Sequence, residues 1–216
     1  QHRQVRDFLM LIIPLIIEQI LAVAVGMADT VMVSSVGEAA ISGVALVDAI
    51  AILLIGLFAA MATGGSVVAA QHLGAYKNKE ANEAGKQLLL SITILSIVLT
   101  AICLIGNRAI LEILYGNVEL NVMSNARTYF YITALSYPFL AIYNGCAALF
   151  RIMGNSQISM RTSLVMNGIN IVGNAFCLYV LKMGVEGVAI PTLISRVVAA
   201  ATILVLIRNR NNLIFI

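Results

Sequence analysis

Long apolar stretches separated by short polar segments dominate the chain. Four of these stretches carry no charged residue, and two more are interrupted by isolated charges at Glu18, Asp29 and Arg196. A helix that crosses a membrane needs about 20 mostly apolar residues. The pattern therefore predicts an all-α membrane protein in which residues 1–216 form one unit of six spans. The expected spans are 8–36, 45–71, 88–106, 126–151, 161–181 and 187–207.

The composition agrees with a membrane protein. The chain of 216 residues is 61% hydrophobic and 11% charged, whereas soluble domains are about 45–50% apolar and about 25% charged. Its net charge of +3 is spread along the sequence rather than gathered on one face, so no nucleic-acid partner is expected. The three cysteines fall in apolar stretches, and this odd number argues against a disulfide framework.

Basic residues are unevenly divided between the two sides of the expected membrane path. Lys and Arg favour the cytoplasmic side of membrane proteins. Nine basic residues share the side of the N-terminus, and three fall opposite. We therefore expect a multi-pass protein of the cell (inner or plasma) membrane, with both termini of this segment cytoplasmic. The nine are Arg3, Arg6, Lys77, Lys79, Lys86, Arg151, Arg161, Arg208 and Arg210, and the three are Arg108, Arg127 and Lys182.

Three charged residues are expected inside the membrane, where charges are costly unless paired or wetted. Counting about 1.5 Å per residue, Glu18 and Arg196 reach similar depths, so we predict a structural ion pair or a shared polar network. Asp29 follows Glu18 on the same helix face, in the outer half of the membrane, with no basic residue expected at its depth. Asp29 is therefore the main functional candidate. The prolines within spans are expected to bend their helices; they are Pro14, Pro138 and Pro191.

The expected fifth span carries three asparagines at the spacing i, i+3, i+7, so that Asn167, Asn170 and Asn174 share one helix face. Thr192 on the sixth span is expected at a depth similar to that of Asn174 and Asp29. Burial favours the protonated form of a carboxyl group. A carboxylate surrounded by neutral oxygens is therefore expected to exchange H⁺ near neutral pH, or to bind Na⁺ as a metal ligand.

Two residues of the fourth span extend the same outer layer. Tyr137 is expected about 15 Å from the external edge, and Thr133 precedes it by one helical turn. Taken alone, Tyr137 or Thr192 is more simply explained by hydrogen bonds between helices, which are common for these residue types in membranes. We place Tyr137 and Thr133, together with Asn167, as supporting residues of a cavity beside the expected ion site.

At these residues the chain resembles the multidrug and toxic compound extrusion (MATE) transporters. The resemblance covers nearly the whole chain and keeps the order and spacing of the motifs. It begins with Pro14 and continues through ADTVMVSSVGEAAISGVAL, VAAQHLGAYKNKEANEA, SYPFLAIYNGCAALFRIMGNSQISM, NIVGN and GVEGVAIPTLISRVV.

The resemblance implies that residues 1–216 are the N-terminal six-helix lobe of a transporter with about twelve helices, so that a C-terminal six-helix lobe is missing from this segment. It also implies that Asp29 binds the coupling H⁺ or Na⁺, with help from Asn170, Asn174 and Thr192. Two positions depart from the pattern. Asn174 is neutral where one branch of the family has Asp, and Pro191 stands where a small residue such as Ala is expected.

The expected function is secondary antiport, in which an inward gradient of H⁺ or Na⁺ drives export of an organic cation or other amphipathic drug, with no cofactor. Two alternatives stay open: a flippase of lipid-linked oligosaccharides from the same superfamily, and a membrane scaffold that transports nothing. An enzyme is not expected, because His2 and His72 stand alone in polar segments and form no HExxH-like metal motif.

Overall fold

The fold is described by a computed structural model for residues 1–209 and 212–216. These residues form helices joined by short loops, and no strand is found among them. The elements in chain order are α1 (His2–Val33), α2 (Glu38–Gly74), α3 (Asn78–Ile105), α4 (Asn107–Tyr115), α5 (Leu120–Ala134), α6 (Tyr137–Ile152), α7 (Ser156–Ala175), the π-helix η1 (Phe176–Val180) and α8 (Glu186–Ile207).

The described residues provide up to six helical stretches long and apolar enough to cross a membrane. Five are continuous, with α7 and η1 counted together, and the sixth is the pair α5 and α6, which bends by 46°. Pro138 in the first turn of α6 has no N–H for the carbonyl of Ala134, the last residue of α5, so the helix breaks here. The all-α fold with six spans is confirmed. Helices α1 and α8 continue through Pro14 and Pro191, where bending stays a prediction.

Several helices extend past the apolar stretches that predicted them, because polar residues continue the helical backbone. Helix α2 begins at Glu38 rather than near residue 45, and α5 begins at Leu120 rather than near residue 126. The segment expected to be a polar joint after residue 106 holds a further helix, α4. The Tyr115 hydroxyl of α4 donates to a backbone carbonyl of α2 at 3.1 Å, which holds the short helix against the bundle.

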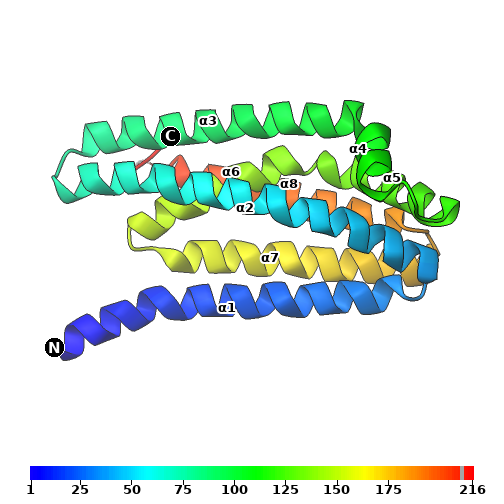
Figure 1. Ribbon diagram of the computed structural model, residues 1–216. Helices are drawn as coiled ribbons and strands as arrows, with labels where there is room; N and C mark the ends of the chain where they lie inside the picture. The colour runs from blue at the N-terminus through cyan, green and yellow to red at the C-terminus, as the bar shows by residue number, and fades with distance from the viewer. Residues whose placement is uncertain (210–211) are drawn as a thin grey trace.

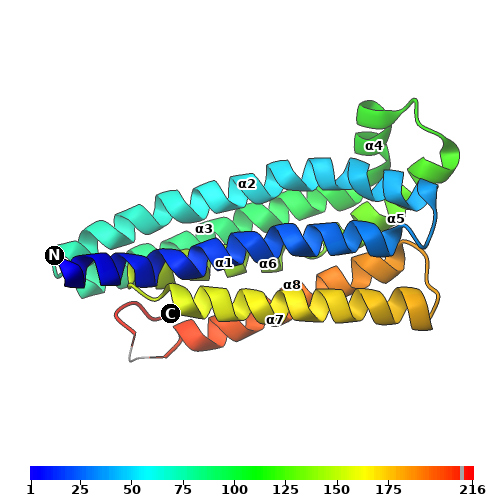
Figure 2. The ribbon, with the colours of Figure 1, turned by 90° about the horizontal axis from the view of Figure 1, so that it is seen from below.

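The long helices run side by side along one axis, with α4 at one end of the bundle (Figure 1 and Figure 2). Helix α1 lies at the edge, packed on α7 and with few contacts to α2 (Figure 1). Much of its surface is open, since Ile20, Val23, Met27 and Val31 are 62–67% exposed. An apolar face of this size needs lipid or further protein to cover it.

The two ends of the bundle differ in charge as the topology predicted. Both chain ends, the turn between α2 and α3 and the turn between α6 and α7 lie toward the same end (Figure 1). These segments hold the basic residues that were assigned to the cytoplasmic side, apart from Arg210, which lies outside the described residues. Which end faces the cytoplasm stays a prediction.

Two apolar clusters fill the interior, and fully buried side chains mark both. One cluster joins α1, α2, α5 and α6 around Phe58 and Tyr137. The other joins α3, α6 and α8 around Leu149 and Ile203. It also includes Ile214, so residues near the C-terminus pack against the end of the bundle that carries the termini.

Helices α7 and α8 pack closely at Gly173. A Cβ at Gly173 would lie 2.8 Å from the Cβ of Pro191, whereas a Cβ at Gly168 on the same helix would meet nothing within 4 Å. We expect Gly173→Ala to destabilise the protein by about 1–3 kcal/mol. Gly168→Ala should be neutral or stabilise by up to about 1 kcal/mol, because alanine favours helix. Thermal unfolding of both purified variants in one detergent measures the difference, and equal effects would contradict the close approach.

Candidate functional site

Asp29 of α1 meets Asn174 of α7 where these two helices pack. The amide Nδ2 of Asn174 donates to Oδ1 of Asp29 at 2.6 Å. Asn174 is fully buried and Asp29 is half-buried. A hydrogen bond to an ionised acceptor is stronger than one between neutral groups. The structure thus joins the carboxylate and the asparagine that were expected to lie in one layer.

A second polar contact lies one helical turn away and joins α7 to α8. The Thr192 hydroxyl donates to the backbone carbonyl of Val188 at 2.9 Å and lies 3.4 Å from Oδ1 of Asn170. The longer of these contacts is weak for a hydrogen bond. The four predicted ion-binding residues therefore form two contacts on neighbouring turns, Asp29 with Asn174 and Asn170 with Thr192.

The backbone of α7 changes its winding directly after Asn174. Helix α7 ends at Ala175, and η1 follows with a hydrogen bond of 3.1 Å from the Leu181 N–H to the Phe176 carbonyl, a five-residue step. Turns of π-helix are rare and occur frequently at functional sites. The apolar pattern of this stretch gave no signal for the change in winding.

A second carboxylate, Asp48 of α2, is connected to this site through Arg196 of α8. The Tyr129 hydroxyl donates to Oδ1 of Asp48 at 3.0 Å. Arg196 donates from Nη1 to the Ser136 hydroxyl at 2.7 Å and interacts electrostatically with both Asp48 and Asp29. No ion pair joins Arg196 to either carboxylate among the described residues, so its charge acts on both from beyond contact distance and offsets part of the cost of placing three charges in a membrane.

The predicted ion pair between Glu18 and Arg196 is wrong. Glu18 accepts hydrogen bonds from Ser159 at 2.6 Å and from Tyr143 at 3.2 Å, and its charged partner is Arg151 at 3.7 Å. These partners come from α6 and α7. Similar depth was necessary for the predicted pair but not sufficient, because helices at one depth can lie on different sides of a bundle.

Asp29 was expected to have no basic residue at its own depth, and Arg196 of α8 acts on it electrostatically without forming an ion pair with it among the described residues. Depth was estimated from backbone positions, and a long arginine side chain carries its charge well away from its own backbone. The positive charge of Arg196 therefore offsets part of the negative charge of Asp29. The chemistry of the site has to include this internal cation.

The residues predicted to support the ion site form no hydrogen bond or ion pair with Asp29 in the described part of the chain. Thr133 and Asn167 form hydrogen bonds within their own helices. Tyr137 is fully buried, with its ring centroid 6.4 Å from that of Phe58. The simpler explanation of these three as helix-stabilising residues fits these contacts.

Sequence reasoning missed the contribution of Asp48 and Tyr129. Asp48 is close to residue 45, where the second span was expected to begin. Helix α2 begins at Glu38, so Asp48 lies about 15 Å along the helix from its first residue. Because the span was counted from residue 45 rather than from Glu38, Asp48 was placed too close to the end of its helix.

The Asn174 amide oxygen is a buried acceptor beside the Asp29 carboxylate. This oxygen is buried and accepts no hydrogen bond from any described residue, a costly arrangement for a polar atom. Hard cations take oxygen ligands, and Asp29 and Asn174 both supply oxygens. Within residues 1–209 and 212–216 no group of three His, Cys, Asp or Glu side chains could hold a metal ion. Na⁺ would therefore rely on one carboxylate and neutral oxygens.

Comparison with known families agrees with the motifs. The family model described as MatE matches residues 14–176, which include Asp29, Asn170 and Asn174. This chain belongs to the MATE family. The resemblance predicted from the sequence is thereby confirmed.

Two MATE relatives and one solved structure show the extent of the similarity. An uncharacterized transporter, YisQ of Bacillus subtilis strain 168, is 26% identical over 201 residues, which cover 91% of this chain and 44% of the relative. The probable multidrug resistance protein NorM of Thermotoga maritima is 24% identical over 216 residues, 95% of this chain and 45% of the relative. An outward-facing multidrug resistance MATE transporter superposes with a TM-score of 0.90 at 24% identity, covering 97% of this chain and 46% of that one.

The chain thus spans about half the length of the MATE relatives that it matches. It corresponds to one lobe of these transporters, as the sequence predicted.

Proposed function

We propose that the native protein is a secondary antiporter of the cell membrane that exports organic cations or related amphipathic drugs in exchange for H⁺ or Na⁺. A second six-helix lobe completes the transporter in this proposal. The contact of 2.6 Å between Asp29 and Asn174 carries the proposal, because it places a half-buried carboxylate beside a buried amide. The words "multidrug resistance" in the names of one relative and one solved structure support a drug-like substrate.

The contact between Asp29 and Asn174 can respond to the arrival of an ion. With Asp29 ionised, the amide N–H donates to the carboxylate. When Asp29 takes up H⁺, it gains an O–H donor and needs an acceptor. The Asn174 amide oxygen has no hydrogen-bond partner among the described residues. Rotation of the amide would present this oxygen to that donor. Na⁺ would use the same oxygen as a ligand, so either ion rearranges the contact between α1 and α7.

A groove of about 330 Å³ between α1 and α2 supports the proposed substrate class. Asp48 is the charged residue of its lining, and the remaining wall is apolar apart from Thr30. One carboxylate in an apolar wall suits a cation with an apolar body, and few fixed polar contacts allow loose selectivity. Because Arg196 interacts with both Asp48 and Asp29, a change in charge at either acid is felt at the other.

Coupling requires that ion and substrate favour different conformations. A ligand that binds two conformations with equal affinity does not shift the equilibrium between them. Helix α1 is the element expected to differ between the two states. It carries Asp29, it lies at the edge of the bundle, and Pro14 interrupts its hydrogen bonding.

The alternative functions have less support from the contacts. A flippase for lipid-linked oligosaccharides must bind diphosphate, which needs free cationic side chains. Arg196 is already engaged by Ser136 and lies near two carboxylates. A scaffold that transports nothing would have no use for a carboxylate beside a buried amide oxygen that lacks a described partner.

Reconstituted transport tests the proposal. The native protein is placed in liposomes loaded with a fluorescent organic cation, and an inward gradient of H⁺ or of Na⁺ is imposed separately. We expect efflux of the dye with one of the two gradients, and loss of that efflux when an ionophore dissipates it. Equal efflux with and without a gradient, or no efflux with either, would contradict antiport. Movement of a lipid-linked oligosaccharide without dye export would favour the flippase.

Removing the amide should change ion binding in a direction that identifies the ion. A hydrogen bond to a charged group contributes about 1.5–3 kcal/mol, and each 1.4 kcal/mol is about tenfold in affinity. The amide N–H stabilises ionised Asp29, so we expect Asn174→Ala to lower the H⁺ concentration for half-maximal efflux by roughly 10–100-fold in an H⁺-driven protein. In a Na⁺-driven protein the loss of the amide oxygen as a ligand should raise the Na⁺ concentration for half-maximal efflux. Asn167→Ala is the matched control on α7, because Asn167 bonds only within its helix. A similar shift in both variants would mean that the amide has no special role.

A further inference from the structure

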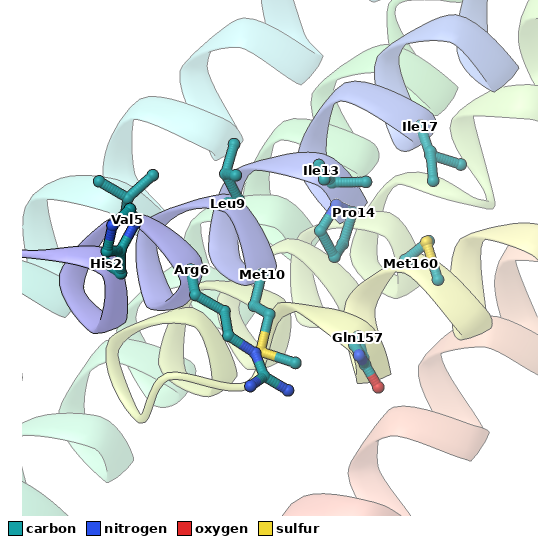
Figure 3. Close-up of a pocket in the computed structure, with 10 residues that line it drawn as sticks. All are labelled: His2, Val5, Arg6, Leu9, Met10, Ile13, Pro14, Ile17, Gln157 and Met160. Atoms are coloured by element: carbon teal, nitrogen blue, oxygen red, sulfur yellow. The ribbon is translucent and has the colours of Figure 1, made fainter.

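A groove that carries both cationic and apolar side chains lies between the first turns of α1 and the start of α7. It has a volume of about 510 Å³ (Figure 3). Arg6 lines one end of it, and Met10, Ile13, Pro14 and Met160 line its apolar part. The proposed antiport places no ion or substrate in this groove, because it lies toward the end of α1 opposite Asp29.

The groove has the length and polarity of one membrane leaflet. Ile17 at its inner end lies 11 residues beyond Arg6, which is about 16 Å along the helix. This is close to half of the hydrocarbon core, which is about 30 Å thick. The first span was predicted to enter the membrane at residue 8, so Arg6 lies at the membrane surface and the apolar wall lies within the leaflet.

The polar end of the groove is available to an anion. Arg6 forms no ion pair with any described residue, and no carboxylate is among the residues that line the groove. Figure 3 shows the Arg6 guanidinium and the Gln157 amide on the same side of the groove, with Met10 beside them. Guanidinium binds phosphate with charge-assisted hydrogen bonds.

We propose that this groove binds an anionic phospholipid of the leaflet at the end of the bundle that carries both termini. The phosphate head group contacts Arg6 and Gln157, and one acyl chain lies along Met10, Ile13 and Met160. The length of the groove fits a lipid of one leaflet. The opposite charges of the head group and Arg6 favour an anionic lipid over a zwitterionic one. The proposal does not depend on antiport, since it concerns a different end of α1.

Tryptophan fluorescence tests the proposal, because residues 1–216 contain no tryptophan and any tryptophan of the second lobe is replaced by phenylalanine. Ile13→Trp places a probe in the groove of the native protein, and Ile20→Trp places a matched probe on the exposed face of α1 outside it. Quenching of the added fluorescence by brominated phosphatidylglycerol is compared with quenching by brominated phosphatidylcholine in nanodiscs. We expect about fivefold preference for the anionic lipid at position 13, the ratio that one cation near a charged membrane contributes, and none at position 20.

Charge variants in the Ile13→Trp protein complete the test. Arg6→Ala should remove the preference, whereas Arg3→Ala, which removes the same charge from the same helix outside the groove, should keep it. Equal quenching by the two lipids, or equal loss of preference in both arginine variants, would overturn the proposal. Absence of quenching by either lipid at position 13 would also overturn it, because protein would then cover the groove.

Discussion

Asp29→Asn is expected to abolish gradient-driven export while leaving the fold intact. Asparagine has nearly the same shape as aspartate, and its side-chain oxygen can still accept the hydrogen bond that Asn174 donates. It cannot take up a proton near neutral pH or supply charge for Na⁺. We therefore expect dye efflux from liposomes to fall to the rate of liposomes without protein, with the unfolding temperature close to that of the wild type.

Asp7→Asn is the matched control for this experiment. Asp7 lies on the same helix and is exposed at the end that carries the chain termini, far along α1 from Asp29. It should export at the wild-type rate, so that a loss confined to Asp29→Asn reports the site rather than a change of charge on α1. Full gradient-driven export by Asp29→Asn would remove the basis of the antiport proposal.

Glu18→Ala is expected to give the largest loss of stability among the substitutions considered. Glu18 joins α1 to α6 and α7 through Tyr143, Ser159 and Arg151. Removing one partner of a buried charge pair costs about 3–5 kcal/mol. The Arg151 side chain is 35% exposed and can recover water, so we expect about 2–4 kcal/mol. Unfolding of the purified native protein in one detergent measures this loss.

Two further variants separate the hydrogen bonds from the charge. Glu18→Gln keeps an oxygen that can accept from Ser159 or Tyr143, and its stability should lie between those of Glu18→Ala and the wild type. Asp7→Ala at an exposed position should stay within about 0.5 kcal/mol of the wild type. If Glu18→Ala were as stable as Asp7→Ala, the network would contribute nothing to holding α1.

The fold was largely predictable because a bilayer restricts what a chain can do. Backbone groups in lipid must be bonded internally, so long apolar stretches become helices. The same argument could not predict α4, because the polar residues of the segment Asn107–Tyr115 form helix outside the apolar pattern. The break at Pro138 was foreseen from the missing N–H, but its angle of 46° depends on packing.

The site was predictable only where depth along the helices decided the contact. Depth placed Asp29 and Asn174 in one layer, and they form a hydrogen bond. It failed for Glu18 and Arg196, because depth does not tell which helices are neighbours or how far an arginine side chain reaches. These relations come from the packing of α1 on α7 and of α8 on α6, which the apolar pattern does not encode.

Ion release on substrate binding tests the central claim most directly. The purified native protein is loaded with H⁺ or Na⁺ in weakly buffered detergent solution, an organic cation is added, and released H⁺ or Na⁺ is counted against bound substrate. The proposed exchange at Asp29 predicts one ion released for each substrate bound by the wild type, and none released by Asp29→Asn. Equal release by both proteins, or substrate binding to the wild type without any release, would contradict it.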